Sequence, residues 1–259
     1  MIINSSQDLV TYQKAADLSL RVLQELKAAV KTGILPIEVD NLAKKLCQEY
    51  HVRPSFLGVA GRQGLFPHAT CICANDSVVH GIPSSTEKFK PGDTVKVDFG
   101  LVYENFFTDH CFTAVIGQPD PKTELLVKTA QKAIQSAALQ ATTGAYSGDL
   151  GHTMHAIALA SGFDVLKQYT GHGIGHTLHE QPMLPAHGQP HTGTKLEKGM
   201  VLCVEAQLVT GSDQVYVAED GWTVKMTDRG NTAMFEYMVV VQDKKPIILT
   251  PNFNWPIVV

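Results

Sequence analysis

Residues 92–102 read Gly-Asp-Thr-Val-Lys-Val-Asp-Phe-Gly-Leu-Val, and residues 199–209 read Gly-Met-Val-Leu-Cys-Val-Glu-Ala-Gln-Leu-Val. The two stretches align without a gap. Their leading glycine, their final Leu-Val pair and one acidic residue, Asp98 or Glu205, coincide. Short apolar runs of this kind, rich in valine, are typical of buried strands. We therefore expect a duplicated strand that brings one acidic side chain from each copy.

The segments before the two strands repeat as well. Apolar residues recur at three- and four-residue steps from Leu9 to Val30, which predicts an amphipathic helix with Ser6 as its N-cap and Gly33 at its end. Pro36 stands where a second helix tolerates it, in the first turn. A second helix pair is predicted over residues 123–141 and 147–160.

The order helix, helix, strand therefore occurs twice. It predicts an α+β fold in which residues 1–259 form one domain. The halves, at about 8–116 and 122–250, would be related by a pseudo-twofold axis around a curved antiparallel sheet. Loops at residues 117–122 and 185–199 are too short to be flexible linkers between independent domains.

Four carboxylates and one imidazole lie in apolar or glycine-rich stretches where a charge is costly. A single carboxylate of this kind is more often solvent-facing or salt-bridged. Taken together, the set favours one or two divalent cations, since an oxygen-rich site with one histidine suits hydrolytic metals. The candidate ligands are Asp98, Asp109, His172, Glu205 and Glu236.

Strand alternation places Asp98 on the face opposite Val97 and Phe99. If Glu104-Asn105 is a two-residue hairpin turn, Asp109 lies opposite Gly100 and on the same face as Asp98. By the same alternation, Glu236 faces away from its neighbours Phe235 and Tyr237. The four carboxylates can therefore line one face of the sheet.

The motifs around these residues resemble the methionine aminopeptidases, which share the pita-bread (creatinase/aminopeptidase) fold. The resemblance runs from about Asp8 to Val241, and the order and spacing of the motifs make it specific. The matching motifs are Asn75-Asp76-Ser77-Val78-Val79-His80-Gly81-Ile82-Pro83, Asp98 with Asp109, Gly171-His172-Gly173-Ile174-Gly175 before His179-Glu180, Gly199-Met200 before Glu205, Asp220-Gly221-Trp222-Thr223-Val224, and Phe235-Glu236.

The resemblance implies two divalent metal ions, with Co, Mn, Fe or Zn as candidates. Asp109 and Glu236 would bridge both positions, Asp98 would complete one, and His172 with Glu205 the other. A water held between the cations, with its pKa lowered toward neutrality, would be the nucleophile. Glu205 would accept its proton and later donate it to the leaving amine.

The same resemblance implies a metallopeptidase, a hydrolase that removes the N-terminal methionine from nascent proteins and peptides. His80 and His179 would flank the scissile amide, with His179 on the carbonyl oxygen. Phe56, Phe66, Cys71 and Trp222 are candidate substrate-binding walls, although such residues are also ordinary core residues. Phe56, Leu178, Tyr237 and a longer loop over residues 57–65 depart from the family pattern and bear on substrate choice.

Two alternatives stay open. One is another hydrolase of this fold that acts on Xaa-Pro bonds, although such enzymes normally carry a large N-terminal domain, and the short chain resembles the type I methionine aminopeptidases. The other is a non-catalytic, peptide-binding relative, which the intact set of five ligands disfavours.

The amino-acid composition limits the class of protein, its compartment and its partners. With 44% apolar residues, 18% charged residues and a net charge of −4, the chain is typical of a globular protein without a nucleic-acid footprint. No signal peptide or membrane span is evident. Five scattered cysteines indicate reduced thiols in the cytoplasm. The expected partners are peptide and nascent-chain N-termini, with the ribosome as a candidate, and a monomer is expected.

Overall fold

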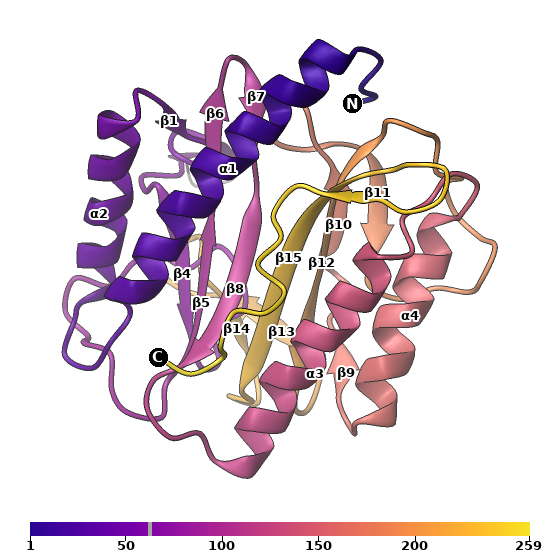
Figure 1. The fold of residues 1–259 in the computed structure, drawn as a ribbon. Coiled ribbons are helices and arrows are strands. Elements are labelled where there is room, and N and C mark those ends of the chain that lie inside the picture. Colours follow the sequence, from indigo (N-terminus) through magenta and orange to yellow (C-terminus); the bar gives the residue numbers. More distant parts are fainter. Residues whose placement is uncertain (62–63) are drawn as a thin grey trace.

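The computed structural model describes residues 1–61 and 64–259. Four α-helices cover one face of a large sheet; α1 and α3 cross in front of it, and α2 and α4 flank them (Figure 1). None of the helices in the described ranges is long and apolar enough to cross a membrane. The helices are α1 (Ser6–Ala29), α2 (Pro36–Glu49), α3 (Pro121–Ala138) and α4 (Ser147–Ala160).

Helices α2 and α4 confirm the predicted starts at Pro36 and Ser147, whereas two predictions for α1 are wrong. Its N-cap is Ser5 instead of Ser6, because the Ser5 hydroxyl accepts a hydrogen bond from the backbone N–H of Asp8 at 2.9 Å. The helix ends at Ala29, before Gly33. Gly33, with φ +88°, lies in the following turn and donates to the carbonyl of Phe89.

The large sheet is antiparallel and has the order β11-β10-β12-β15-β8-β5-β4, with β16 beside β15 and β9 beside β12. Smaller sheets are formed by β1-β6-β7, β13-β14 and β2-β3. The bounds are β1 Arg53–Pro54, β2 Ala60–Gly61, β3 Gly64–Leu65, β4 Thr70–Ala74, β5 Thr94–Phe99, β6 Leu101–Tyr103, β7 Phe106–Phe107, β8 His110–Val115, β9 Asp164–Val165, β10 Thr170–Gly173, β11 Glu180–Pro185, β12 Val201–Val209, β13 Val215–Val217, β14 Val224–Met226, β15 Thr232–Val240 and β16 Ile247–Ile248.

The hairpin that carries Asp98 and Asp109 has the predicted register. Tyr103 pairs with Phe106, so Glu104-Asn105 is a two-residue turn, and both residues have positive φ (46° and 66°). Such angles are typical of turns that match the twist of the flanking strands. Phe99 pairs with His110, which brings Gly100 and Asp109 opposite each other.

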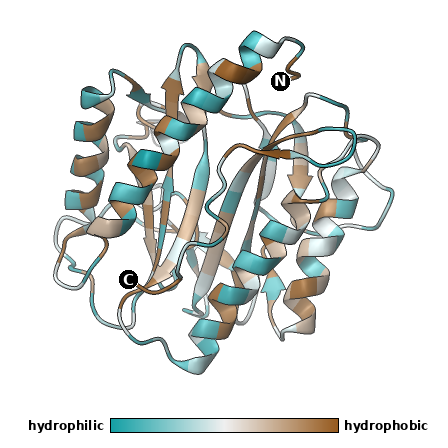
Figure 2. Ribbon diagram, in the orientation of Figure 1, coloured by the Kyte–Doolittle hydropathy of each residue, from teal (hydrophilic) through white to brown (hydrophobic). Residues whose placement is uncertain are grey.

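The main core lies between the helices and the sheet. It includes Val97, Phe99, Phe235 and Tyr237, the neighbours from which Asp98 and Glu236 were predicted to face away. Hydrophilic and hydrophobic residues alternate along α1 and α3, as expected for helices with one buried side (Figure 2). The carboxylates therefore belong to the face that the helices leave uncovered.

The duplicated strands β5 and β12 lie on either side of the central pair β8 and β15. Lys96 of β5, 1% exposed, reaches across this centre. Its ammonium donates to the carbonyl and hydroxyl of Thr232 on β15 and to the carbonyl of Asn75. We therefore propose that residues 1–259 form one domain in which the predicted halves share this sheet.

Helix α2 is attached to the start of β4 by the buried carboxylate of Asp40. One oxygen accepts from the backbone N–H groups of Ala69 and Thr70, and the other from Lys44 and His68. Burial raises the pKa of Asp40, but the bonds from Lys44 and His68 outweigh this and hold it below its ordinary value.

Asp40→Ala should lower the free energy of unfolding by about 2–4 kcal/mol at pH 7, because it leaves buried donors unpaired. A carboxyl with a lowered folded pKa stabilises the fold above the ordinary carboxyl pKa. That contribution is lost as the pH falls through the folded value. The difference from the parent in urea unfolding should therefore shrink below about pH 4.

Glu49→Ala, an exposed change on the same helix, is the control and should cost under about 0.5 kcal/mol. Equal effects of the two changes would contradict this account.

Candidate metal centre

Three of the predicted ligands lie in one row across four neighbouring strands. Asp98 of β5 pairs with Cys111 of β8, Cys111 pairs with Glu236 of β15, and Glu236 pairs with Glu205 of β12. Paired strands lie about 4.8 Å apart. Asp109 precedes Cys111 by two residues and belongs to the same face. The register of the sheet therefore brings the four carboxylates together.

His172 reaches the row from β10. It pairs with Cys203, two residues before Glu205 on β12. Its Nε2 lies 3.7 Å from Asp109 Oδ2 and 3.9 Å from both Glu205 Oε1 and Glu236 Oε1. Gly171 allows this close packing, because a Cβ there would lie 2.4 Å from the carbonyl oxygen of Cys203.

The environment of His172 fixes its tautomer. Nδ1 lies 2.9 Å from the carbonyl oxygen of Gly173, which accepts but cannot donate, so Nδ1 carries the proton. Burial, with a smaller contribution from the neighbouring His179, lowers the pKa of His172 to about 4. At neutral pH the ring is therefore uncharged and directs the free electron pair of Nε2 at the carboxylates, as a metal ligand must.

The four carboxylates lie close together, and among the described residues their negative charge is not compensated. Asp109, Glu205 and Glu236 are 4%, 9% and 1% exposed. Burial raises the pKa of Asp98 to about 7, and burial with the charge of Asp98 raises that of Glu205 to about 8. Burial and the neighbouring carboxylates also raise the pKa of Asp109 and Glu236 well above the ordinary range.

These residues fit divalent cations. Within the described ranges, Oδ1 of Asp98, Oδ1 of Asp109 and Oε1 of Glu236 are buried without a hydrogen-bond partner, which is the environment that a cation satisfies. Ligand atoms lie within 4.8 Å of one another in three groups: Asp98, Asp109 and Glu236; Asp109, His172 and His179; and His172, Cys203 and Glu236. Asp109, His172 and Glu236 each belong to two of these groups, and of these three only the two carboxylates have a second oxygen to offer.

Two exposed histidines flank the cluster. The ring of His179 lies 4.5 Å from that of His172, and burial with the charge of His179 lowers the pKa of His80. His80 has φ +55° and packs edge-on against Tyr169 at 5.9 Å. The structure therefore brings both predicted histidines to the mouth of the carboxylate cluster.

The predicted substrate walls belong to one apolar cluster beside Asp98. Phe56, Phe66 and Cys71 are buried, Trp222 packs against them, and Cys71 pairs with Asp98 across β4 and β5. The rings of Phe66 and Trp222 lie 5.1 Å apart. Leu178, one of the departures from the family pattern, belongs to the same cluster, whereas Tyr237 lies in the main core. Residues 62 and 63 of the loop predicted to be long lie outside the described ranges.

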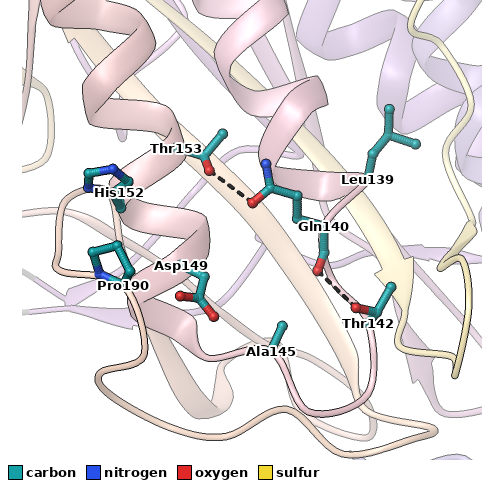
Figure 3. Close-up of a pocket in the computed structure, with 8 residues that line it drawn as sticks. All are labelled: Leu139, Gln140, Thr142, Ala145, Asp149, His152, Thr153 and Pro190. Atoms are coloured by element: carbon teal, nitrogen blue, oxygen red, sulfur yellow. Dashed lines mark hydrogen bonds between the residues drawn. The ribbon is translucent and has the colours of Figure 1, made fainter.

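A surface pocket of about 450 Å³ between α3 and α4 is separate from these residues (Figure 3). In it, the Asp149 carboxylate accepts from the backbone N–H groups of Tyr146 and His191 and so caps α4. His187 also lies on this side of the molecule, next to His155. The pocket is lined by Leu139, Gln140, Thr142, Ala145, Asp149, His152, Thr153 and Pro190.

Sequence reasoning missed several side chains of the site. Cys111 lies within the row, Cys203 pairs with His172 and shares a ligand group with Glu236, and Gln207 donates to Glu205 Oε2 at 2.7 Å. Strand alternation could have found all three, because each lies two residues from a predicted ligand. Tyr169 meets His80 only through the fold, so no local pattern could have found it.

The comparisons with known proteins agree with this geometry. Residues 11–243 match the model of metallopeptidase family M24. The chain is 32% identical over 250 residues to a methionine aminopeptidase from Aquifex aeolicus, covering 95% of this chain and 97% of that one. The crystal structure of methionine aminopeptidase from Thermotoga maritima aligns with a TM-score of 0.91 and 33% identity, over 96% of this chain and 99% of that one.

A prolidase from Pyrococcus furiosus aligns with a TM-score of 0.75 at 20% identity, over 96% of this chain and 65% of that one. At this identity the likeness concerns the fold alone. It agrees with the predicted pita-bread architecture, a curved antiparallel sheet with paired helices.

Glu236→Gln should have opposite effects on stability with and without metal. In metal-free protein at pH 7 it removes a buried carboxyl that must either stay charged beside other carboxylates or take up a proton, and both cost free energy, so the thermal midpoint should rise. Mn(II) at about 100 times its Kd should add about 2.7 kcal/mol to the parent, or about 5–10 °C. The variant should lose most of this gain. Glu197→Gln, the same change at an exposed position, should behave as the parent. A parent midpoint that does not respond to Mn(II), Co(II), Fe(II) or Zn(II) would refute the metal assignment.

Proposed function

This chain belongs to metallopeptidase family M24, and we propose that it is a methionyl aminopeptidase, a metal-dependent hydrolase that removes the N-terminal methionine from nascent proteins and peptides. The observation that carries this proposal is the cluster of four carboxylates and one neutral imidazole, with two exposed histidines at its mouth. Near-full-length similarity to methionine aminopeptidases supports the same function.

Five residues would hold two divalent cations drawn from Co, Mn, Fe and Zn. Asp109 and Glu236, which belong to two ligand groups each and have two carboxylate oxygens, would contact both cations. Asp98 would complete one position, and His172 with Glu205 the other. When bound, such cations lower the pKa of a coordinated water toward neutrality and polarise the substrate carbonyl.

Glu205 is the group that moves the proton. Its Oε1 lies 3.9 Å from His172 Nε2 and so faces the other candidate ligands. This oxygen accepts the proton of the water and later delivers it to the leaving amine nitrogen. One carboxylate therefore serves both halves of the reaction.

His179 and His80 interact with the scissile amide of the substrate. The pKa of each is lowered, for His179 by burial and for His80 by burial and then by His179, so both are neutral N–H donors at physiological pH. His179, beside His172, donates to the carbonyl oxygen as negative charge develops there. His80, which packs against Tyr169, interacts with the amide nitrogen.

The apolar cluster of Phe56, Phe66, Cys71 and Trp222 holds the methionine side chain. Its aromatic edges suit a thioether, and its position next to Asp98 places the first residue of the substrate beside the carboxylates. Phe56 and Leu178 are the residues of this cluster that differ from the family pattern. They determine how large the first residue of an accepted substrate can be.

The alternative functions have less support. An Xaa-Pro dipeptidase and an X-Pro aminopeptidase share the fold at 18% and 20% identity, and this chain covers only 64% and 65% of their lengths. A non-catalytic, peptide-binding role is disfavoured because all five ligands and both histidines are present. We further propose that the protein acts as a monomer in the cytoplasm on emerging chains near the ribosome. The five free, buried cysteines are consistent with a reducing compartment.

Metal-depleted protein should cleave no peptide, and Mn(II), Co(II) or Fe(II) should restore cleavage. The reconstituted enzyme should then be compared on Met-Ala, Leu-Ala and Xaa-Pro peptides. We expect release of methionine from the Met-Ala peptide at the highest kcat/KM. Preferred Xaa-Pro cleavage would replace this function with the first alternative, and metal binding without cleavage would favour the second.

His179→Ala should reduce kcat on the Met-Ala peptide by about 10²- to 10³-fold, the effect of losing one donor to a developing oxyanion. Bound metal, measured by mass spectrometry, should not change. His176→Ala removes another exposed histidine of the same loop, and it should keep the parent activity. Loss of metal from the His179 variant would instead make His179 a ligand, as its place in one ligand group allows.

A further inference from the structure

Gln207 is a buried polar residue with no role so far. It is 1% exposed and lies on β12 two residues after Glu205, so both side chains belong to the same face. Its Nε2 donates to Glu205 Oε2 at 2.7 Å and contacts the sulfur of Met234, its cross-strand partner, at 3.5 Å. Its Oε1 has no partner among the described residues.

Packing alone does not explain this amide. A buried carbonyl oxygen without a partner is destabilising, and a methionine of similar length would fill the same space without that cost. The one strong interaction of Gln207 is the bond to Glu205. The role of the Gln207 side chain therefore depends on its hydrogen bond to the carboxylate of Glu205.

Glu205 differs from the other three carboxylates in this respect. Within the described ranges, no other amide, hydroxyl or ammonium side chain donates a hydrogen bond to any of the four. Glu205 is also the carboxylate to which the proposed mechanism gives the proton transfer. The residue that would move the proton is thus the one that accepts a hydrogen bond from a side-chain amide.

The hydrogen bond from Gln207 gives the two carboxylate oxygens of Glu205 different environments. Oε2 is engaged by Gln207, while Oε1 points toward His172 Nε2 at 3.9 Å. The terminal torsion of a glutamate is soft, so a carboxylate without this bond would rotate and exchange its oxygens. The hydrogen bond holds the plane of the group, so that Oε1 keeps its direction toward His172 and the other candidate ligands.

We propose that Gln207 is a positioning residue that orients Glu205 by holding Oε2 and leaving Oε1 directed at the reacting atoms. This inference rests on the proposed aminopeptidase function, because it assigns Gln207 to the proton-transfer step. It adds a residue on the same strand whose effect on the reaction passes entirely through Glu205.

Gln207→Met tests the proposal because it keeps the length and removes the hydrogen bond. At saturating Mn(II), kcat on the Met-Ala peptide should fall by about 10- to 100-fold, the usual scale for losing a group that orients a ligand. KM should stay within about twofold, since Gln207 touches no substrate. The thermal midpoint should hold or rise, because the unpaired carbonyl is gone.

Loss of activity without loss of stability separates positioning from a structural role. Met234→Leu changes the facing side chain and keeps the bond to Glu205, so it should retain the parent kcat. If Gln207→Met does not fold, Gln207→Leu gives the same comparison with a smaller side chain. A folded variant with the parent kcat at saturating Mn(II) would overturn the positioning role and leave the proposed function intact. A parent that binds Mn(II) without releasing methionine would overturn both.

Discussion

Four carboxylates crowded on one face of a sheet are the constraint on which the rest of this protein depends. Burial raises the pKa values of Asp98, Asp109, Glu205 and Glu236, and the charges of neighbouring carboxylates raise those of Asp109, Glu205 and Glu236 further. Divalent cations would supply the charge that such a cluster lacks. The helices cover the opposite face, so the fold keeps its apolar core and its charged centre on different sides of the same strands. A neutral His172 completes the set by offering an electron pair instead of a fifth charge.

The centre lies where the two proposed halves meet. Asp98 and Glu205 occupy equivalent positions in the duplicated strands, and they flank the central pair β8 and β15, which supplies Asp109 and Glu236. Lys96 reinforces this junction with a buried ammonium that holds β15 and the turn at Asn75 to β5. That turn leads to His80. The residues that would bind metal and those that would contact substrate are therefore fixed by the same few backbone connections.

Much of this arrangement follows from local patterns in the sequence. The hairpin turn at Glu104-Asn105 sets the register that brings Asp109 beside Asp98, and strand alternation sets the direction of Glu236. The helix boundaries were less predictable, because Ser5 and Ser6 are both good caps and only the bond from Asp8 decides between them. Contacts between distant segments, such as His80 with Tyr169 or Asp40 with the start of β4, leave no periodic signal. They are found only when the chain is folded.

The most direct test of the two-cation centre is anomalous diffraction from a crystal of the Mn(II)-loaded protein. The account predicts two anomalous peaks about 3.5–4 Å apart, with the carboxylates of Asp109 and Glu236 bound to both. Asp98 should bind one of these ions, and His172 with Glu205 the other. Peaks that contact neither Asp109 nor Glu236, for example at His155 and Asp164 on the far side of the molecule, would contradict it.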